Sequence, residues 1–155
     1  MKLVLVQINS KLGAFKSNFE KILLYANEAA VNGCDLIVFP ESALPGYHPF
    51  DLLERKNFVQ QQLQYLNQLS RALPPNLHVL VGAIVTNPSK KGRPWFNTGA
   101  LLVKGQRPRF FHKTLLPSND VFDEHRFFEP GDVQKNQFTL LGKKILVTIC
   151  EDIWA

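Results

Sequence analysis

Residues 144–154 read Lys-Ile-Leu-Val-Thr-Ile-Cys-Glu-Asp-Ile-Trp, an apolar, β-branched run that ends in a thiol and two carboxylates. Both alternating sets of this run are mostly apolar, which is typical of a strand covered on both faces. The pattern predicts a strand with Cys150 at its carboxyl end. A cysteine there can be a nucleophile only if a neighbouring cation stabilises the thiolate, because a free thiol has a pKa of ~8.5.

The composition is that of one folded domain. The 155 residues are 45% hydrophobic and 11% aromatic, which is enough for a packed core. No apolar run approaches the ~20 residues of a membrane span and no signal-peptide pattern is visible, so we expect a cytoplasmic protein with no membrane partner. Cys34 and Cys150 form no metal-type pair, so we expect no metal site and a structural role for Cys34.

The net charge of +5 would suit an anionic partner. Seven of the 18 lysines and arginines lie in two stretches, 90–93 and 104–113. Most of them flank strands or occupy turns, where solvated lysines and arginines are routine. We therefore expect no nucleic-acid partner.

The order of apolar runs predicts an α/β domain of layered type. Ser17 and Glu20 have the spacing of a capping box, which predicts a helix from Ser17 to Asn32. A second helix is expected over about Phe58 to Leu73, ended by two prolines. Strands are expected at Leu3–Ile8, read as a buried central strand, at Leu36–Phe39, at Leu77–Val85, and in two hairpins, Thr98–Val103 with Arg109–Lys113 and Phe138–Leu140 with Lys144–Ile149.

Three ionisable residues lie at the ends of predicted strands, where central sheets collect ligands: Glu41, Lys113 and Cys150. If they converge, Lys113 lowers the pKa of the thiol and holds a developing oxyanion, and Glu41 accepts the thiol proton and returns it to a leaving amine. Backbone N–H groups after Cys150 would be a second oxyanion donor. Taken singly, each residue is more often a solvated strand end or an inert core cysteine.

Two loops are rich in aromatic residues. Ser42–Phe50 is expected to line or cover something, and 114–137 lacks clear periodicity and is interpreted as an ordered binding loop.

Three motifs match a known family. Phe39-Pro40-Glu41, His112-Lys113-x-x-Leu116-Pro117 and Ile149-Cys150-Glu151-Asp152-x-Trp154 resemble the nitrilase (carbon-nitrogen hydrolase) superfamily, in which a Glu-Lys-Cys triad falls at those motifs. Within it, the run from Val121 to Gly131 resembles the glutaminase domain of glutamine-dependent NAD synthetases.

The resemblance implies a fold, an activity and a set of site residues. The fold is an αββα sandwich, here truncated to its first half, with residues 1–155 as the amino-terminal part of the glutaminase domain. The catalytic residues are Glu41, Lys113 and Cys150, and the substrate glutamine is contacted by Asn119, Phe122, Glu124 and Glu151, with Glu124 supporting the lysine. Ser118-Asn119-Asp120 stands where many of these synthetases carry a tyrosine.

The same resemblance implies partners that lie outside the chain. ATP and magnesium would bind only in the missing synthetase domain, so no cofactor is expected here, and the full-length protein is expected to be a homo-oligomer. We expect the isolated chain to be weakly active or inactive. The alternatives are a stand-alone amidase of a small ω-amide or carbamoyl substrate, and a non-catalytic scaffold whose truncated sheet assembles with a partner.

Overall fold

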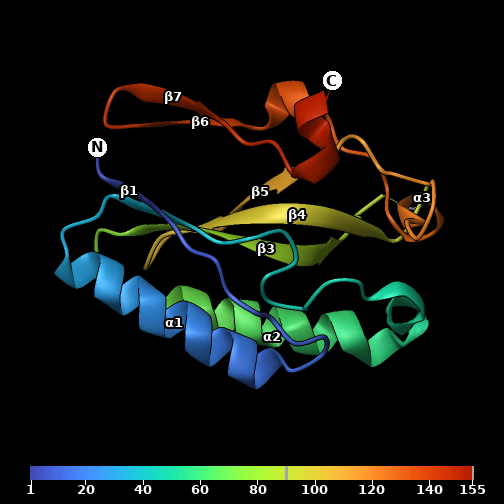
Figure 1. Cartoon of the computed structure of the whole chain (residues 1–155), viewed down its shortest axis with the longest axis horizontal. Coiled ribbons are helices and arrows are strands. Elements are labelled where there is room, and N and C mark those ends of the chain that lie inside the picture. Colours follow the sequence, from blue (N-terminus) through green and yellow to red (C-terminus); the bar gives the residue numbers. More distant parts are fainter. Residues whose placement is uncertain (90, 155) are drawn as a thin grey trace.

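A five-stranded sheet separates a pair of helices from a two-stranded hairpin (Figure 1). The computed structural model describes residues 1–89 and 91–154, so Lys90 of the basic stretch and Ala155 lie outside the described residues. None of the helices in this described part is long and apolar enough to cross a membrane. The elements are β1 (Leu3–Leu5), α1 (Phe15–Val31), β2 (Leu36–Val38), η1 (Phe50–Glu54), α2 (Lys56–Ala72), β3 (His78–Thr86), β4 (Trp95–Leu102), β5 (Arg109–His112), α3 (Glu124–Phe127), η2 (Val133–Lys135), β6 (Gln137–Leu140), β7 (Lys143–Leu146) and η3 (Cys150–Trp154).

The direction of the strands decides which side chains meet. The sheet order is β1-β2-β3-β4-β5, with β1, β2 and β3 parallel to one another. β4 is antiparallel to β3, and β5 is antiparallel to β4. β5 therefore runs in the same direction as β2, and the carboxyl ends of these two strands lie at the same edge of the sheet.

The two helices cover one face of this sheet, where Figure 1 shows α1 and α2 side by side. Each helix is amphipathic, so it buries one apolar stripe and leaves the other face in water. The core between helices and sheet includes Ile22, Ala26, Leu66, Leu69, Ile37 and Val79. Cys34 also belongs to this core, as expected of a structural cysteine, and it is buried.

The hairpin of β6 and β7 covers the opposite face of the sheet. Its turn places Leu141 and Gly142 at φ +48° and +73°, which is the backbone that tight two-residue hairpins need. A second core lies between hairpin and sheet, formed by Leu36, Leu80, Leu101, Phe111, Phe138, Leu140, Val147 and Ile149. Arg109 of β5 donates to the carbonyl of Gln137 at 3.0 Å and ties the two layers together.

The expectation of a buried central strand at Leu3–Ile8 is wrong. β1 spans only Leu3–Leu5 and is the edge strand of the sheet in the described chain. Val4 packs toward the helices, whereas Leu3 and Leu5 on the other face are 44% and 72% exposed. A continuous apolar run does not distinguish an edge strand with one bare face from a central strand.

The predicted capping box at Ser17 and Glu20 is also wrong. α1 begins at Phe15, so Ser17 lies inside its first turn, and the cap residue Ala14 makes no side-chain hydrogen bond. The start of the helix is held instead by Asn18. Its side-chain amide donates to the carbonyl of Lys11 at 2.8 Å and accepts from the N–H of Lys11 at 3.0 Å. α2 and the hairpin of β4 with β5 are confirmed close to their expected bounds.

The strand predicted to carry Cys150 ends earlier and is less covered than its sequence indicates. β7 stops at Leu146, which is 59% exposed, and Cys150 is the first residue of η3. The prediction failed because β7 belongs to the second layer and pairs only with β6 among the described strands. Cys150 therefore approaches the edge of the central sheet from the opposite layer.

Gly82 in β3 allows the turn after β2 to lie directly against the sheet. A Cβ atom at this position would be 2.2 Å from the nitrogen of Ser42 and 2.3 Å from the carbonyl oxygen of Pro40. Both contacts are with backbone, so a larger side chain can be accommodated only if the Pro40–Ser42 turn moves.

We expect Gly82→Ala to lower the free energy of unfolding by about 3 kcal/mol, because overpacking against backbone cannot be relieved by rotation of a side chain. Denaturant unfolding measures this loss. Gly99→Ala is the matched control, because Gly99 pairs with Gly82 across the sheet and a Cβ there meets only side-chain atoms, the nearest at 3.3 Å. Equal losses in the two variants would contradict the steric argument.

Candidate active site

Lys113 is the centre of a buried ionic cluster. Its side chain is fully buried, and its Nζ lies 2.8 Å from Oε1 of Glu41 and 2.9 Å from Oε1 of Glu124. The residue immediately follows β5, where its N–H donates to the carbonyl of Asn97 at 2.9 Å and its carbonyl accepts from Gly131 at 2.8 Å. Two neighbouring segments thus fix the lysine backbone before its side chain reaches the carboxylates.

Glu41 reaches this cluster from a turn that is bonded to β3. The N–H of Phe39 donates to Leu80 at 2.8 Å, and the N–H of Leu44 donates to Gly82 at 3.0 Å, so the turn between them is held at both ends. Asn97 of β4 donates to Oε1 of Glu41 at 2.7 Å, the same oxygen that accepts from Lys113. The carboxylate is therefore oriented by two donors.

Cys150 lies beside the cluster and is accessible to solvent. Its backbone has φ +47°, a left-handed conformation that residues other than glycine rarely adopt. A cavity of about 110 Å³ is lined by both Cys150 and Glu41, together with Pro40, Gly82, Thr98 and Ile149. A small substrate group that enters this cavity would contact the thiol and the carboxylate together.

The electrostatics of the cluster keep the thiol protonated. Burial alone would lower the pKa of Lys113, but Glu41 and Glu124 outweigh it and raise the pKa, so the amine stays charged. Burial and the charge of Glu41 raise the pKa of Cys150 above its ordinary value, against the opposing effect of Lys113. Lys113 lowers the pKa of the Cys150 thiol, as expected, but burial and the charges of Glu41 and Glu124 outweigh it.

A backbone donor lies next to the thiol. A hydrogen bond from the backbone of Glu151 to Cys150 lowers the pKa of the thiol, although it does not reverse the upward shift. Backbone N–H groups after Cys150 stay the predicted second oxyanion donor, and the N–H of Glu151 is the first of them.

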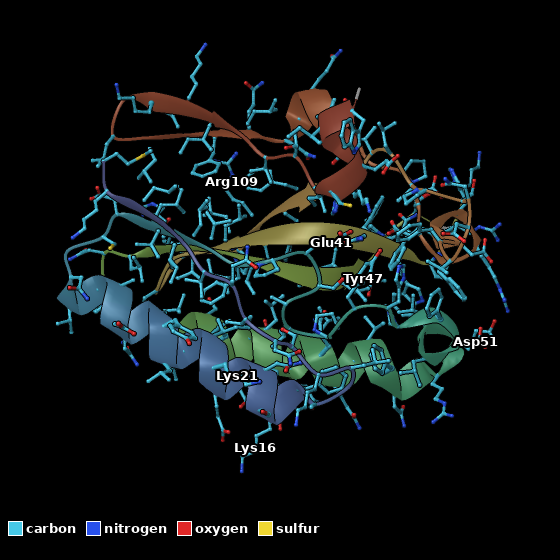
Figure 2. The ribbon with its side chains drawn as sticks, in the orientation of Figure 1. Lys16, Lys21, Glu41, Tyr47, Asp51 and Arg109 are labelled. Carbon is cyan, nitrogen blue, oxygen red and sulfur yellow. The ribbon has the colours of Figure 1, made fainter. Side chains whose placement is uncertain are left out.

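An aromatic loop borders the site. Figure 2 shows Tyr47 close to Glu41, and the charges of Glu41, Glu124 and Cys150 add to burial in raising the pKa of the Tyr47 phenol. The ring of His48 lies 5.4 Å from that of Phe122 and 4.4 Å from that of Phe50, measured between centroids. Burial, together with Lys113, lowers the pKa of His48.

The residues expected from sequence to contact substrate have different positions. Glu124 is 1% exposed and bonds Lys113, and Phe122 is half-buried against His48. Glu151 is half-buried and follows the thiol directly. Asn119 is exposed on the surface of the loop, where its carbonyl accepts from the N–H of Phe122 at 3.1 Å.

Sequence reasoning missed two residues of this site, Asn97 and Tyr47. Asn97 lies inside a strand, where an asparagine is depleted and therefore worth notice. Tyr47 was noticed only as part of an aromatic loop. Within residues 1–89 and 91–154, no three His, Cys, Asp or Glu side chains are grouped so that they could hold a metal ion.

Comparison with other sequences identifies relatives of the whole chain. A glutamine-dependent NAD(+) synthetase of Synechocystis sp. is 40% identical over 155 residues, which are 98% of this chain and 28% of that protein. The synthetase of Thermotoga maritima with the same name is 35% identical over 156 residues, 99% of this chain and 26% of that protein. The chain thus spans less than a third of the length of these curated relatives.

Solved structures give the same family and the same fold. The glutamine-dependent NAD+ synthetase from Acinetobacter baumannii superposes with a TM-score of 0.87 at 36% identity, over 98% of this chain and 28% of that one. An amidase from Nesterenkonia sp. superposes with a TM-score of 0.74 at 17% identity, over 94% of this chain and 54% of that one, and this likeness concerns the fold alone. The chain thus has the α/β fold of these nitrilase-type structures. Because the carbon-nitrogen hydrolase family model matches residues 2–155, the chain belongs to the carbon-nitrogen hydrolase family.

Proposed function

We propose that residues 1–155 are the amino-terminal part of a glutaminase domain that hydrolyses the side-chain amide of glutamine through Glu41, Lys113 and Cys150. The observation that carries the proposal is the buried Lys113 between two carboxylates, beside an exposed thiol in a shared cavity. The similarity to glutamine-dependent synthetases supports glutamine as the substrate.

The geometry supports a two-stage acyl transfer. Glu41 accepts the proton of Cys150 as the sulfur bonds to the amide carbon, and the oxyanion is stabilised by Lys113 and the Glu151 N–H. The tetrahedral adduct then collapses: the C–N bond breaks, Glu41 returns the proton to nitrogen, and ammonia leaves a thioester on Cys150. Water, deprotonated by Glu41, attacks this thioester, the C–S bond breaks, and Glu41 returns the proton to sulfur, which releases glutamate and the thiol.

The raised pKa of Cys150 agrees with this role of Glu41. A thiol that is protonated at rest needs a base at the moment of attack, and Glu41 is the charged carboxylate that shares its cavity. The same negative charge that keeps the proton on sulfur is available to receive it. Glu124 then serves Lys113, whose Nζ it bonds, and not the thiol.

The ammonia has a proposed use in the protein that the complete gene encodes. By similarity to the relatives, a synthetase domain would use ATP and magnesium to amidate deamido-NAD to NAD with this ammonia, and the full-length protein would be a homo-oligomer. Both statements rest on that similarity.

The experiment is ammonia release by the protein as its complete gene encodes it, with Cys150→Ala as the negative control. We expect glutamine to be preferred over other small amides and carbamoyl compounds, and the control to release ammonia at the background rate. Preference for another amide would replace this proposal by the stand-alone amidase. Equal rates in wild type and control would remove the thiol from the mechanism and favour a scaffold.

A further inference from the structure

Asp152 is a buried carboxylate that no catalytic step uses. Its side chain is 4% exposed. Oδ1 accepts from the backbone N–H groups of Thr114 at 2.9 Å and Leu115 at 2.8 Å, and Oδ2 accepts from the N–H of Ile149 at 3.0 Å. All three donors are therefore satisfied by one side chain.

These three donors belong to the two segments that carry the lysine and the thiol. Thr114 and Leu115 directly follow Lys113, and Ile149 directly precedes Cys150. The N–H of Asp152 also donates to the carbonyl of Ile149 at 3.1 Å. Ile149 and Asp152, which lie before and after Cys150, therefore each donate a hydrogen bond to the other. Asp152 thereby joins the layer of β7 to the edge of the central sheet next to the reacting groups.

The backbone conformation of Cys150 needs such support from its neighbours. A cysteine at φ +47° is in a conformation that persists only where the surrounding structure determines it. The reciprocal bonds between Ile149 and Asp152 enclose this residue. The bonds to Thr114 and Leu115 then set where the enclosed thiol lies relative to Lys113.

We propose that Asp152 is a positioning residue that holds Cys150 in place against Lys113. The role requires a carboxylate, because both oxygens must accept and the three N–H groups come from two directions. An asparagine offers one accepting oxygen and a donating amide, so it can satisfy one of the two segments only. The inference rests on the proposed catalytic roles of Cys150 and Lys113, but its test does not require hydrolysis.

The first measurement is amide hydrogen exchange of the whole chain in Asp152→Asn. We expect exchange at Leu115 and Ile149, which lie 34 positions apart in the sequence, to accelerate together, by about tenfold. Asp132→Asn is the matched control, because Asp132 is an exposed aspartate that accepts from the N–H of Gln134 within its own short helix. Acceleration confined to one of the two segments in Asp152→Asn would overturn the proposal.

The second measurement is the rate at which iodoacetamide alkylates Cys150, followed in a double-mutant cycle with Lys113→Met. If Asp152 acts by placing the thiol against Lys113, Asp152→Asn slows alkylation about tenfold when Lys113 is present and changes it less than about twofold when it is absent. A purely local effect, or the lost charge of Asp152 itself, would change both backgrounds by the same factor. That equal change would overturn the positioning role.

Cys34 reports folding in the same samples, because it is buried in the core and should be alkylated only after unfolding. If Asp152→Asn exposes Cys34, Asp152→Glu takes its place in both measurements, since it keeps both oxygens and displaces them by one methylene. A positive result here together with no glutamine hydrolysis would reject the proposed function and leave the positioning of the thiol intact. Glutamine hydrolysis together with a negative result in these two measurements would reject the positioning role and leave the proposed function intact.

Discussion

Glu41→Gln is expected to abolish amide hydrolysis and at the same time to make the Cys150 thiol more acidic. The carboxylate is the proposed proton acceptor, and loss of a general base costs about 10² to 10⁴ in kcat. Its negative charge also raises the pKa of Cys150, so the neutral glutamine lowers that pKa. Below its pKa a thiol gains thiolate about tenfold per pH unit, so the variant should be alkylated faster than wild type at pH 8.

Both effects are measured on one preparation, by ammonia release and by alkylation between pH 6 and 10. In the wild type, the alkylation rate should still be rising at about pH 9, since the pKa of Cys150 is raised above the ordinary ~8.5 of a thiol. Glu20→Gln on the exposed face of α1 is the control and should alter neither rate. A fall in both hydrolysis and alkylation would mean that Glu41 supports the thiol structurally and is not its base.

Lys113→Met should lose both activity and stability at neutral pH. Removing an oxyanion donor costs about 10² to 10³ in kcat. The substitution also leaves Glu41 and Glu124 facing each other without the cation, and breaking a buried pair costs about 3–5 kcal/mol of unfolding free energy. Denaturant unfolding and ammonia release measure the two losses separately.

The loss of stability should depend on pH with a defined sign. Burial already raises the pKa of Glu124, and without the opposing effect of Lys113 it should lie further above the ~4.3 of an unfolded glutamate. The folded form then binds protons more readily than the unfolded form, so the stability deficit against wild type shrinks as the pH falls toward about 5.

The double variant Lys113→Met with Glu124→Gln separates structure from chemistry. It removes one of the two facing charges, so most of the stability should return at neutral pH. Activity should not return, since no cation is restored. Recovery of hydrolysis in the double variant would show that Lys113 is needed only to keep the carboxylates apart.

The local parts of the fold were readable from the sequence because their signals are local. The apolar stripe of α2 ends at two prolines, and the hairpin of β4 and β5 surrounds a turn glycine, Gly105, so periodicity and turn chemistry were sufficient. Lys113 likewise follows β5 directly, as its strand pattern predicts, whereas Cys150 lies beyond the end of β7 and begins η3.

The parts that failed depend on contacts between distant segments. Whether an apolar run such as Leu3–Ile8 is central or at an edge is decided by what lies on its far side, which a single strand does not encode. The layer that carries Cys150 is decided by pairing of β7 with β6. The roles of Asn97 and Asp152 were not predicted for the same reason, because Asn97 bonds Glu41 and Asp152 bonds Thr114 and Leu115, all far away in the sequence.

The two carboxylates around a single ammonium have a consequence for the resting protein in an oxidising cell. Peroxide attacks thiolates and reacts poorly with protonated sulfur. Because burial and the charge of Glu41 raise the pKa of Cys150, we expect its accessible sulfur to be converted to sulfenic acid slowly while no substrate is present.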